Sequence, residues 1–302
     1  MSRRREISRR LEALSYIAGI MSAMKGLALM EVRILTDFLA SQQRMVAGIE
    51  AAAVDFLAWH PEFANVPVAG QELCVLIGSE QGFCGDFNEA LLARMETLCA
   101  EKNTPLRWVI VGRRLASRMG ERDCVDLALP GAIVADEVPA VLLRLTRELS
   151  RLLAGSELAG YGLSALYHCA ASGEIRLRRL LPLRDFPTPE RAYPYPAELN
   201  LSPEEFLQGL TGHYLHAALN EVLYSSLMAE NRQRQAHMDR ALQRLDEDSA
   251  RLRINYNTQR QEEITEEIEV ILLSADMLNE AEEHSLEAAP IGVLQAGMLE
   301  RQ

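Results

Sequence analysis

Two apolar rows, each repeating every seven residues, run through roughly the first sixty residues and constrain the fold more than any other feature. The first row is Ile7, Leu14, Met21, Ala28, Leu35, Gln42, Ile49 and Phe56. The second row is Leu11, Ala18, Lys25, Val32, Leu39, Val46 and Ala53. Only Gln42 and Lys25 are polar, and a repeat of this length is typical of a coiled-coil helix. We therefore predict one helix from about Arg3 to about His60, ended by Pro61.

A partner for this helix is predicted at the other end of the chain. Residues 228–277 contain no Gly and no Pro, and their apolar residues form only a narrow stripe: Met238, Leu242, Leu245, Leu252 and Tyr256. Such a stripe suits one partner helix and is too narrow for a whole core. Residues 1–44 carry eight basic against four acidic residues, and residues 228–302 carry sixteen acidic against eight basic ones. Opposite charges favour pairing of the two ends in a long antiparallel coiled coil.

The middle of the chain has a different pattern, in which short strands alternate with helices. Strands are predicted at 72–78, 107–112 and 124–127, helices at 86–99, 113–120 and 136–154, and a hairpin at 163–170 and 175–183. This order predicts a small, Rossmann-like sheet covered by helices. The fold class is therefore α+β, with an α/β domain inserted into the coiled coil. We predict an N-terminal helix at 1–60, the inserted domain with its linkers at 61–199, a C-terminal helix at 200–279 and a flexible tail at 280–302.

The start of the C-terminal helix is marked by Ser202 as N-cap and Pro203 at the first helical position. Five prolines between 182 and 196 predict an extended crossing before it. Gly209 or Gly212 is a possible point of interruption.

Charge, cysteine content and hydropathy limit the partners and the compartment that this chain can have. The net charge of −12 and pI near 5.1 argue against nucleic acid as the main partner. Five cysteines without a CxxC pair favour a reducing compartment. We identify no signal peptide and no uninterrupted run of eighteen apolar residues. The chain is therefore expected in the cytoplasm unless a partner holds it at a membrane.

The stretch Gly78–Gly85 lies between a predicted strand and a predicted helix, where a phosphate-binding loop would be found. It lacks the glycine spacing of dinucleotide-binding loops, and it lacks the Lys and hydroxyl of a nucleoside triphosphate loop. A tight turn is the favoured interpretation. Cys84 in this turn is expected to be a structural thiol because the sequence places no base beside it.

Other candidate ligands also have ordinary explanations. His213 would need a metal-binding partner four residues later, where Ala217 stands, and the acidic run from Glu262 to Glu269 is expected to be a solvated face. No catalytic residue, metal site or cofactor is predicted, and direct binding of nucleotide is not expected.

A further apolar row lies beside the heptad seam of the first helix. Its members are Ile17, Ile20, Met24, Leu27, Ile34 and Phe38. One partner helix cannot cover both rows. Two alternatives remain open: the row packs against the inserted domain, or it is covered by a sleeve of other subunits.

Four stretches together resemble the gamma subunit, the central rotor shaft, of F-type ATP synthases. They are Ile20-Met-Ser-Ala-Met-Lys25, Gly82-Phe-Cys-Gly-Asp-Phe-Asn88, Leu180-Leu-Pro-Leu183, and a C-terminal string. That string contains Tyr256-Asn257, Arg260-Gln261 and Ile264-Thr265-x-Glu267-Ile268, with Glu230, Arg234 and Met238 upstream at matching separations. The string is the most specific of the four, because coiled coils in general would not reproduce it.

The resemblance implies a non-catalytic rotor subunit that couples ion flow through a membrane sector to ATP synthesis or hydrolysis. Its partners would be the alpha and beta subunits of the catalytic ring, the epsilon subunit and the membrane c-ring. The complex would be peripheral, on the cytoplasmic side of a bacterial inner membrane. Residues carried over as partner contacts are Met24, Lys25, Glu230, Arg234, Tyr256, Asn257, Arg260, Gln261, Thr265 and Glu267.

Some positions depart from the family pattern, namely Ser22, Met30, Glu31, Leu242 and Arg244. They are consistent with a divergent branch, such as the alternate F-type ATPases that pump Na+ in place of H+. Two competing interpretations remain. A coiled-coil tether or scaffold with a small α/β module would form symmetric homodimers through residues 7–56. A Rossmann-type enzyme with helical arms would bind nucleotide at Gly78–Gly85.

Overall fold

The computed structural model describes residues 3–63, 72–101, 106–120, 122–154, 162–183 and 195–287. Contacts within the chain divide it into two units. One consists of residues 20–242, and the other combines residues 1–19 with residues 243–302. The larger unit contains the sheet.

Two long helices, α1 (Arg3–Trp59) and α5 (Pro203–Glu287), account for the predicted coiled coil. Ser202 caps α5 as predicted, because its Oγ accepts from the Glu205 amide at 3.3 Å while Glu205 Oε2 accepts from the Ser202 amide at 3.3 Å. The helix continues through Gly209 and Gly212. It also continues to Glu287, so the predicted tail from residue 280 is wrong for 280–287. Residues 288–302, and the proline-rich crossing at 184–194, lie outside the described residues.

In the smaller unit the two helices pair through the predicted seam. Ile7, Leu11, Leu14 and Ala18 are half-buried, as are Leu245, Leu252 and Tyr256 on α5. Arg4 Nε lies 3.0 Å from Glu263 Oε2. The antiparallel prediction is confirmed here, because the start of α1 meets the later part of α5.

In the larger unit the same antiparallel order holds. Phe38 stacks on Tyr224 with ring centroids 5.4 Å apart, and Phe56 contacts Phe206 at 5.0 Å. Lys25 forms an ion pair with Asp239. Ala28, Leu35, Leu39, Val46, Ala53 and Phe56 of the seam are buried. The heptad rows therefore identified the buried face of α1 correctly.

Within the described residues, the sheet has five strands in the order β3-β2-β1-β4-β5. They are β1 (Glu72–Ile77), β2 (Leu106–Val111), β3 (Val125–Leu129), β4 (Gly162–His168) and β5 (Ile175–Leu181). Pairing is parallel except between β4 and β5, which form the predicted hairpin. The connecting helices are α2 (Phe87–Glu101), α3 (Arg113–Met119) and α4 (Val138–Ala154), with short 3-10 turns η1 (Pro61–Phe63) and η2 (Ala135–Glu137). The predicted α+β class with an inserted α/β domain is confirmed.

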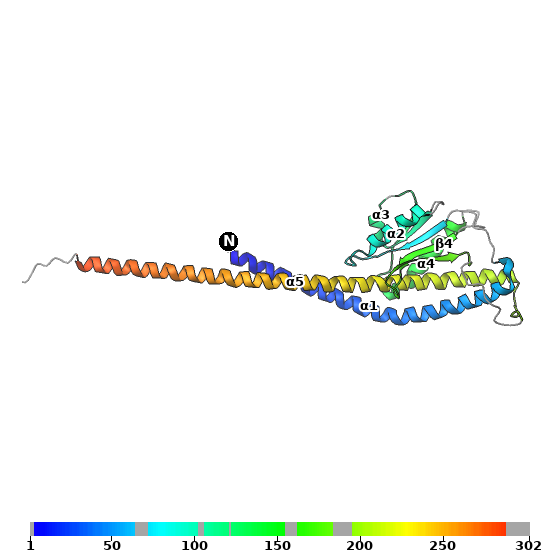
Figure 1. The fold of residues 1–302 in the computed structure, drawn as a ribbon, viewed down its shortest axis with the longest axis horizontal. Helices are drawn as coiled ribbons and strands as arrows, with labels where there is room; N and C mark the ends of the chain where they lie inside the picture. The colour runs from blue at the N-terminus through cyan, green and yellow to red at the C-terminus, as the bar shows by residue number, and fades with distance from the viewer. Residues whose placement is uncertain are drawn as a thin grey trace, which may run out of the picture. The chain divides into compact units, whose positions relative to one another are not determined.

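Strand alternation divides the core between the two faces of the sheet. On β1, Leu73, Val75 and Ile77 face a cluster with α1, α4 and α5, whereas Cys74 and Leu76 face α2 and α3. Figure 1 shows the same layering within this unit, with α2 and α3 on one side of the sheet and α4 and α5 on the other. The long helices are therefore part of the domain core and not merely attached to it.

Arg178 of β5 joins the sheet to both long helices. Its guanidinium donates to Glu50 of α1 at 2.7 Å and to Glu221 of α5 at 2.6 Å, and it lies 5.9 Å from the centre of the Tyr214 ring. Its side chain is 20% exposed, and that of Glu221 is 14% exposed. One cation thus neutralises two carboxylates that would otherwise repel each other.

We expect Arg178→Met to lower the free energy of unfolding by about 2–3 kcal/mol, since it leaves Glu221 largely buried without its cation. The partly exposed Glu50 contributes little of this because solvent screens it. Urea unfolding measures the effect, and Arg176→Met, at an exposed position two residues away, is the matched control. Arg178→Met combined with Glu221→Gln should recover part of the loss; an additive double variant would contradict the pairing.

Candidate functional site

The carboxyl ends of β1 and β4 form the place where an open parallel sheet usually holds its ligand. The chain leaves β1 to build β2 and β3 on one side and β4 on the other, so the strand order reverses between β1 and β4. Here α5 lies across this point. Ser226 Oγ donates to the Ile77 carbonyl at 3.3 Å, and the Ala170 amide donates to Ser225 Oγ at 2.9 Å. The ligand position is thus occupied by the chain's own helix.

Glu80 takes up backbone donors that a phosphate would need in this region. Its Oε2 accepts from the amide of Arg113, at the start of α3, at 2.9 Å and from the Gly131 amide at 2.7 Å. Arg113 Nε lies 3.0 Å from Glu80 Oε1, and the Glu80 side chain is only 6% exposed. A bound anion would have to displace this carboxylate. The geometry therefore argues against the enzyme alternative that needs nucleotide at Gly78–Gly85.

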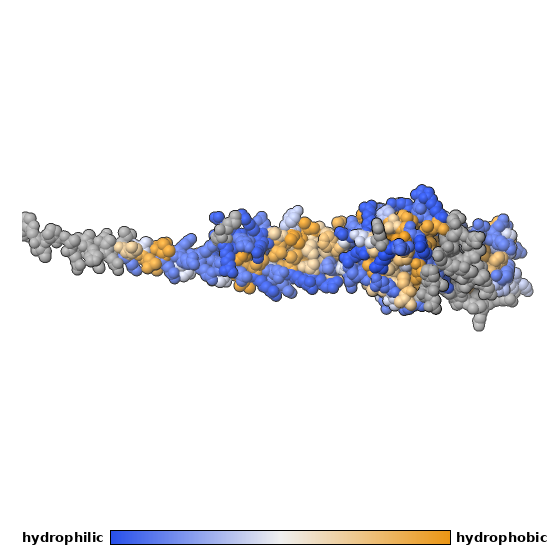
Figure 2. Space-filling view, turned by 90° about the horizontal axis from the view of Figure 1, so that it is seen from above, coloured by the Kyte–Doolittle hydropathy of each residue, from blue (hydrophilic) through white to orange (hydrophobic). Residues whose placement is uncertain are grey.

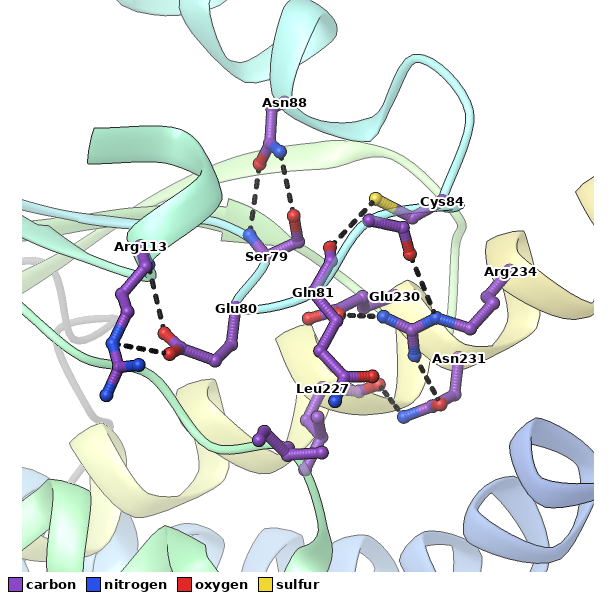
Figure 3. Close-up of polar contacts among 12 residues, drawn as sticks. Ser79, Glu80, Gln81, Cys84, Asn88, Arg113, Leu227, Glu230, Asn231 and Arg234 are labelled. Atoms are coloured by element: carbon purple, nitrogen blue, oxygen red, sulfur yellow. Dashed lines mark hydrogen bonds and ion pairs between the residues drawn. The ribbon is translucent and has the colours of Figure 1, made fainter. Parts of the chain in front are cut away.

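The loop from Gly78 to Asp86 is held by short-range and long-range contacts (Figure 3). Asn88 of α2 accepts from the Ser79 amide at 3.0 Å and donates to Ser79 Oγ at 2.7 Å. Gly112 has φ 114°, and a Cβ there would lie 2.7 Å from the carbonyl oxygens of Gly78 and Ser79. Phe83 has a positive φ of 65°, and its side chain is 59% exposed. The tight-turn interpretation fits this geometry. The contacts of Asn88 and Gly112 with Gly78 and Ser79 hold the start of the turn in place.

Glu230, Asn231 and Arg234 of α5 are buried beneath this loop and hold it in place. Arg234 Nε donates to the Gly82 carbonyl at 3.3 Å, and its Nη1 donates to Asn231 Oδ1 at 2.7 Å. Its Nη2 pairs with Glu230, and Asn231 donates in turn to the Leu227 carbonyl at 3.0 Å. Glu230, Asn231 and Arg234 are 4%, 2% and 5% exposed. Figure 3 shows them converging beneath Gln81 and Cys84.

Burial determines the protonation of this site. It raises the pKa of Glu230 to about 7, although Arg234 and the backbone of Gln81 and Glu80 oppose the rise. Burial also raises the pKa of the Cys84 thiol. A protonated, buried thiol is a poor nucleophile, which agrees with a structural Cys84. Within the described residues, no group of three His, Cys, Asp or Glu could hold a metal ion.

The proposed partner-contact residues fall into two kinds in the larger unit. Met24 lines a cavity of about 220 Å³ beside Gln81 and Arg234, and Lys25 pairs with Asp239. Glu230 and Arg234 are buried and bonded within the chain. Within the chain they position the 78–86 loop. The sequence string alone does not distinguish a partner contact from an internal bond.

The remaining predicted residues belong to the smaller unit. Tyr256 is half-buried in the seam, whereas Asn257, Arg260, Gln261, Thr265 and Glu267 are exposed. The Thr265 hydroxyl donates back to the Gln261 carbonyl at 2.9 Å, one helical turn earlier. The exposed side chains are free of the coiled-coil seam, as a partner-facing surface requires.

The second apolar row of α1 remains at the surface. Leu27 is 61% exposed, and Ile17, Ile20, Ile34 and Phe38 are also exposed. Figure 2 shows apolar surface alongside the long helices. By length and composition this helix also contains a stretch that could cross a membrane, and only 6% of that stretch is buried. This stretch is not free of charged residues, so it is not an uninterrupted apolar run. Met24 and Leu27 line a cavity together with Gln81 and Ile133 of the inserted domain. Coverage of the exposed side chains by other subunits stays a prediction.

Sequence reasoning did not find Glu80, Asn231 or Arg178 as organising residues. Glu80 and Arg178 bond to residues far away in sequence, Gly131 for Glu80 and Glu50 for Arg178, whereas Asn231 bonds to Leu227 and Arg234 on its own helix. A local pattern carries no signal for the long-range pairs. The only available hint was that Asn231 lies between Glu230 and Arg234 within one helical turn.

Comparison with known proteins supplies the family. The family described as ATP synthase matches residues 3–278. A protein of Geobacter metallireducens called ATP synthase gamma chain is 23% identical over 291 residues, covering 92% of this chain and 99% of the relative. The ATP synthase gamma chain of Chlorobaculum tepidum is 25% identical over 301 residues, covering 91% and 99%.

Solved structures show the same fold. A chain of the Euglena gracilis mitochondrial ATP synthase, in the OSCP/F1/c-ring structure, matches with a TM-score of 0.58 and 15% identity, covering 98% of this chain and 99% of that one. A chain of the Tetrahymena thermophila mitochondrial ATP synthase central stalk and c-ring structure matches with a TM-score of 0.51 and 17% identity, covering 74% and 99%. Because the family match spans nearly the whole chain and these relatives are gamma chains, the chain belongs to the ATP synthase gamma family.

Proposed function

We propose that this chain is the central-stalk subunit of a rotary ATP synthase, a non-catalytic rotor that couples ion flow to ATP synthesis or hydrolysis. The observation that carries the proposal is the pair of terminal helices, antiparallel and leaving both an exposed polar motif and an exposed apolar row. Its partners are the alpha and beta subunits of the catalytic ring, the epsilon subunit and the c-ring. The chain is peripheral, reaching the membrane through the complex, and we place it on the cytoplasmic side of a bacterial inner membrane.

The structure supports a mechanical role through its asymmetry. A pair of helices presents different side chains around its circumference, so three chemically equal catalytic sites around it meet three different surfaces. Shifting a two-state site from mostly one form to mostly the other takes about 5.5 kcal/mol of differential contact. Exposed polar contacts worth about 0–1 kcal/mol each can supply this in steps and still break on rotation. Asn257, Arg260, Gln261, Thr265 and Glu267 are exposed in the manner such contacts need.

Two features disfavour a stand-alone scaffold. The seam of α1 is already used by α5 within one chain, so residues 7–56 do not offer it to a second copy. The apolar row that remains exposed lies on a different face of α1 from that seam. A symmetric homodimer through the seam would require the chain to open first.

Stoichiometry tests the proposal. We expect an affinity-tagged chain, expressed with its neighbouring genes, to copurify as one copy per three copies each of two larger nucleotide-binding chains. Native mass spectrometry of the complex and of the isolated chain gives both numbers. A stable homodimer of the isolated chain, with no larger chains retained in the complex, would support the scaffold alternative and refute the rotor.

A further inference from the structure

A pocket of about 230 Å³ lies where the end of α1 meets the start of α5, within the larger unit. Its walls include the rings of Phe56, Trp59, His60 and Phe206. Phe56 lies at the centre of this aromatic group, with centroid distances of 4.6 Å to His60 and 5.0 Å to Phe206. Phe56 itself is 6% exposed, so its ring is enclosed by its neighbours, whereas Trp59, His60 and Phe206 are half-buried.

The charge around the pocket is negative. Two carboxylates, those of Asp55 and Glu198, line it, and among its described lining residues there is no Lys or Arg. The faces of aromatic rings carry negative partial charge, so they attract a cation approaching within about 6 Å. Carboxylates beside such rings strengthen the preference. The two carboxylates and the aromatic rings of this pocket therefore favour an organic cation over an anionic group.

Size and opening indicate how the cation is delivered. Pockets that hold free small molecules usually measure roughly 300–1,000 Å³, and this one is smaller. Pro196, Ala197 and Glu198 on one wall are exposed, so the pocket opens to solvent on that side. In so small a site, a free ligand makes too few contacts to offset the translational freedom that it loses on binding. A side chain that an adjacent protein surface already holds loses much less translational freedom.

We propose that this pocket binds the guanidinium group of an arginine presented by a partner protein. A planar guanidinium stacks on aromatic faces and bonds to carboxylates with the same group, which a compact ammonium does less well. The site lies at the end of α1, far along the chain from Arg260 and Gln261. It stands on the pocket alone and does not require that the rotor assignment be correct.

Trp59 offers a direct test, because the chain contains two tryptophans and the other, Trp108, is fully buried in the sheet core. In the isolated full chain labelled with ¹⁵N-tryptophan, N-acetyl-arginine methylamide should shift the Trp59 indole signal saturably, with half-saturation on the order of 10 mM. The Trp108 signal should stay in place. The neutral citrulline analogue, which has nearly the same shape, should leave both signals unchanged.

Asp55→Asn combined with Glu198→Gln should weaken arginine binding about three- to tenfold. Glu62→Gln is the matched control, since Glu62 lies 3.2 Å from His60 but does not line the pocket. Circular dichroism checks that each variant is folded. Equal shifts by arginine and citrulline, or movement of Trp108 along with Trp59, would show non-specific binding and overturn the proposal. Tighter binding of tetramethylammonium than of arginine would replace the partner arginine with a free quaternary ammonium ligand.

Discussion

Arg234→Met should destabilise the chain by about 3–5 kcal/mol at pH 8, the largest loss of stability we expect from any single substitution. The change removes the cation paired with Glu230 and leaves a carboxylate that is 4% exposed. It also removes the donor to the Gly82 carbonyl. Methionine keeps most of the volume of the arginine stem, so the loss reports the buried charge more than a cavity. Urea unfolding of the isolated chain measures it.

The loss should depend on pH in a defined direction. The folded state raises the pKa of Glu230 from 4.5 to about 7, so the folded chain binds a proton more readily than the unfolded chain. The stability that protonation of Glu230 contributes is therefore fully present below about pH 4.5 and is lost as pH rises to 7. Without Arg234 the pKa of Glu230 rises further. The gap between Arg234→Met and wild type should then widen above pH 7 and stay constant below it.

Two further variants separate this effect from general damage. Glu230→Gln cannot ionise, so its stability relative to wild type should change by about 3 kcal/mol between pH 4.5 and pH 7. The control is Arg240→Met, on the same helix. The exposed Arg240 donates to the Ala236 carbonyl one turn away at 3.3 Å, so this substitution should change the free energy of unfolding little. A gap for Arg234→Met that does not vary between pH 6 and 9 would mean that Glu230 is not the group left uncompensated.

Arg260→Ala combined with Gln261→Ala should reduce coupled ATP turnover by about tenfold while the complex still assembles. Both side chains are exposed, so their loss leaves the coiled-coil seam intact. A tenfold loss corresponds to about 1.4 kcal/mol of contact that differs between rotational positions. ATP-driven ion pumping in membrane vesicles measures the coupled turnover. The subunit content of the purified complex shows whether it still assembles.

A matched pair keeps this second result interpretable. Arg253→Ala combined with Asn255→Ala alters two exposed side chains of the same helix outside the motif, and it should leave turnover near normal. If the Arg260 and Gln261 variant turned over like wild type, the proposed contact with the ring would be wrong. If both double variants failed equally, the exposed surface would act through its general polarity and not through these two residues.

Regular patterns allowed most of the fold to be predicted. The heptad rows gave the buried face of α1 because a coiled coil repeats with the period of the helix. The strands were found because alternation or uninterrupted apolar runs reflect burial directly. The end of α5 was misplaced because Asn279, a residue type common at helix C-termini, does not end the helix, which continues to Glu287.

The candidate site was harder to predict because its bonds join distant segments. Glu230 and Arg234 were singled out from the string they share with the family, yet their burial depends on the 78–86 loop, far away along the chain. Glu80 offered no signal, since a glutamate in a glycine-bearing loop is equally compatible with solvent. Arg260 and Gln261 are exposed, and their contact with a partner stays a prediction.

The position of α5 at the carboxyl ends of β1 and β4 has a further consequence. A sheet of this kind ordinarily depends on a solute for the group that fills its crevice, so its state varies with the concentration of that solute. Here the filling group is covalently attached, and its effective concentration does not change with metabolism. The crevice at the ends of β1 and β4 is therefore filled by α5 whatever the concentration of any soluble ligand.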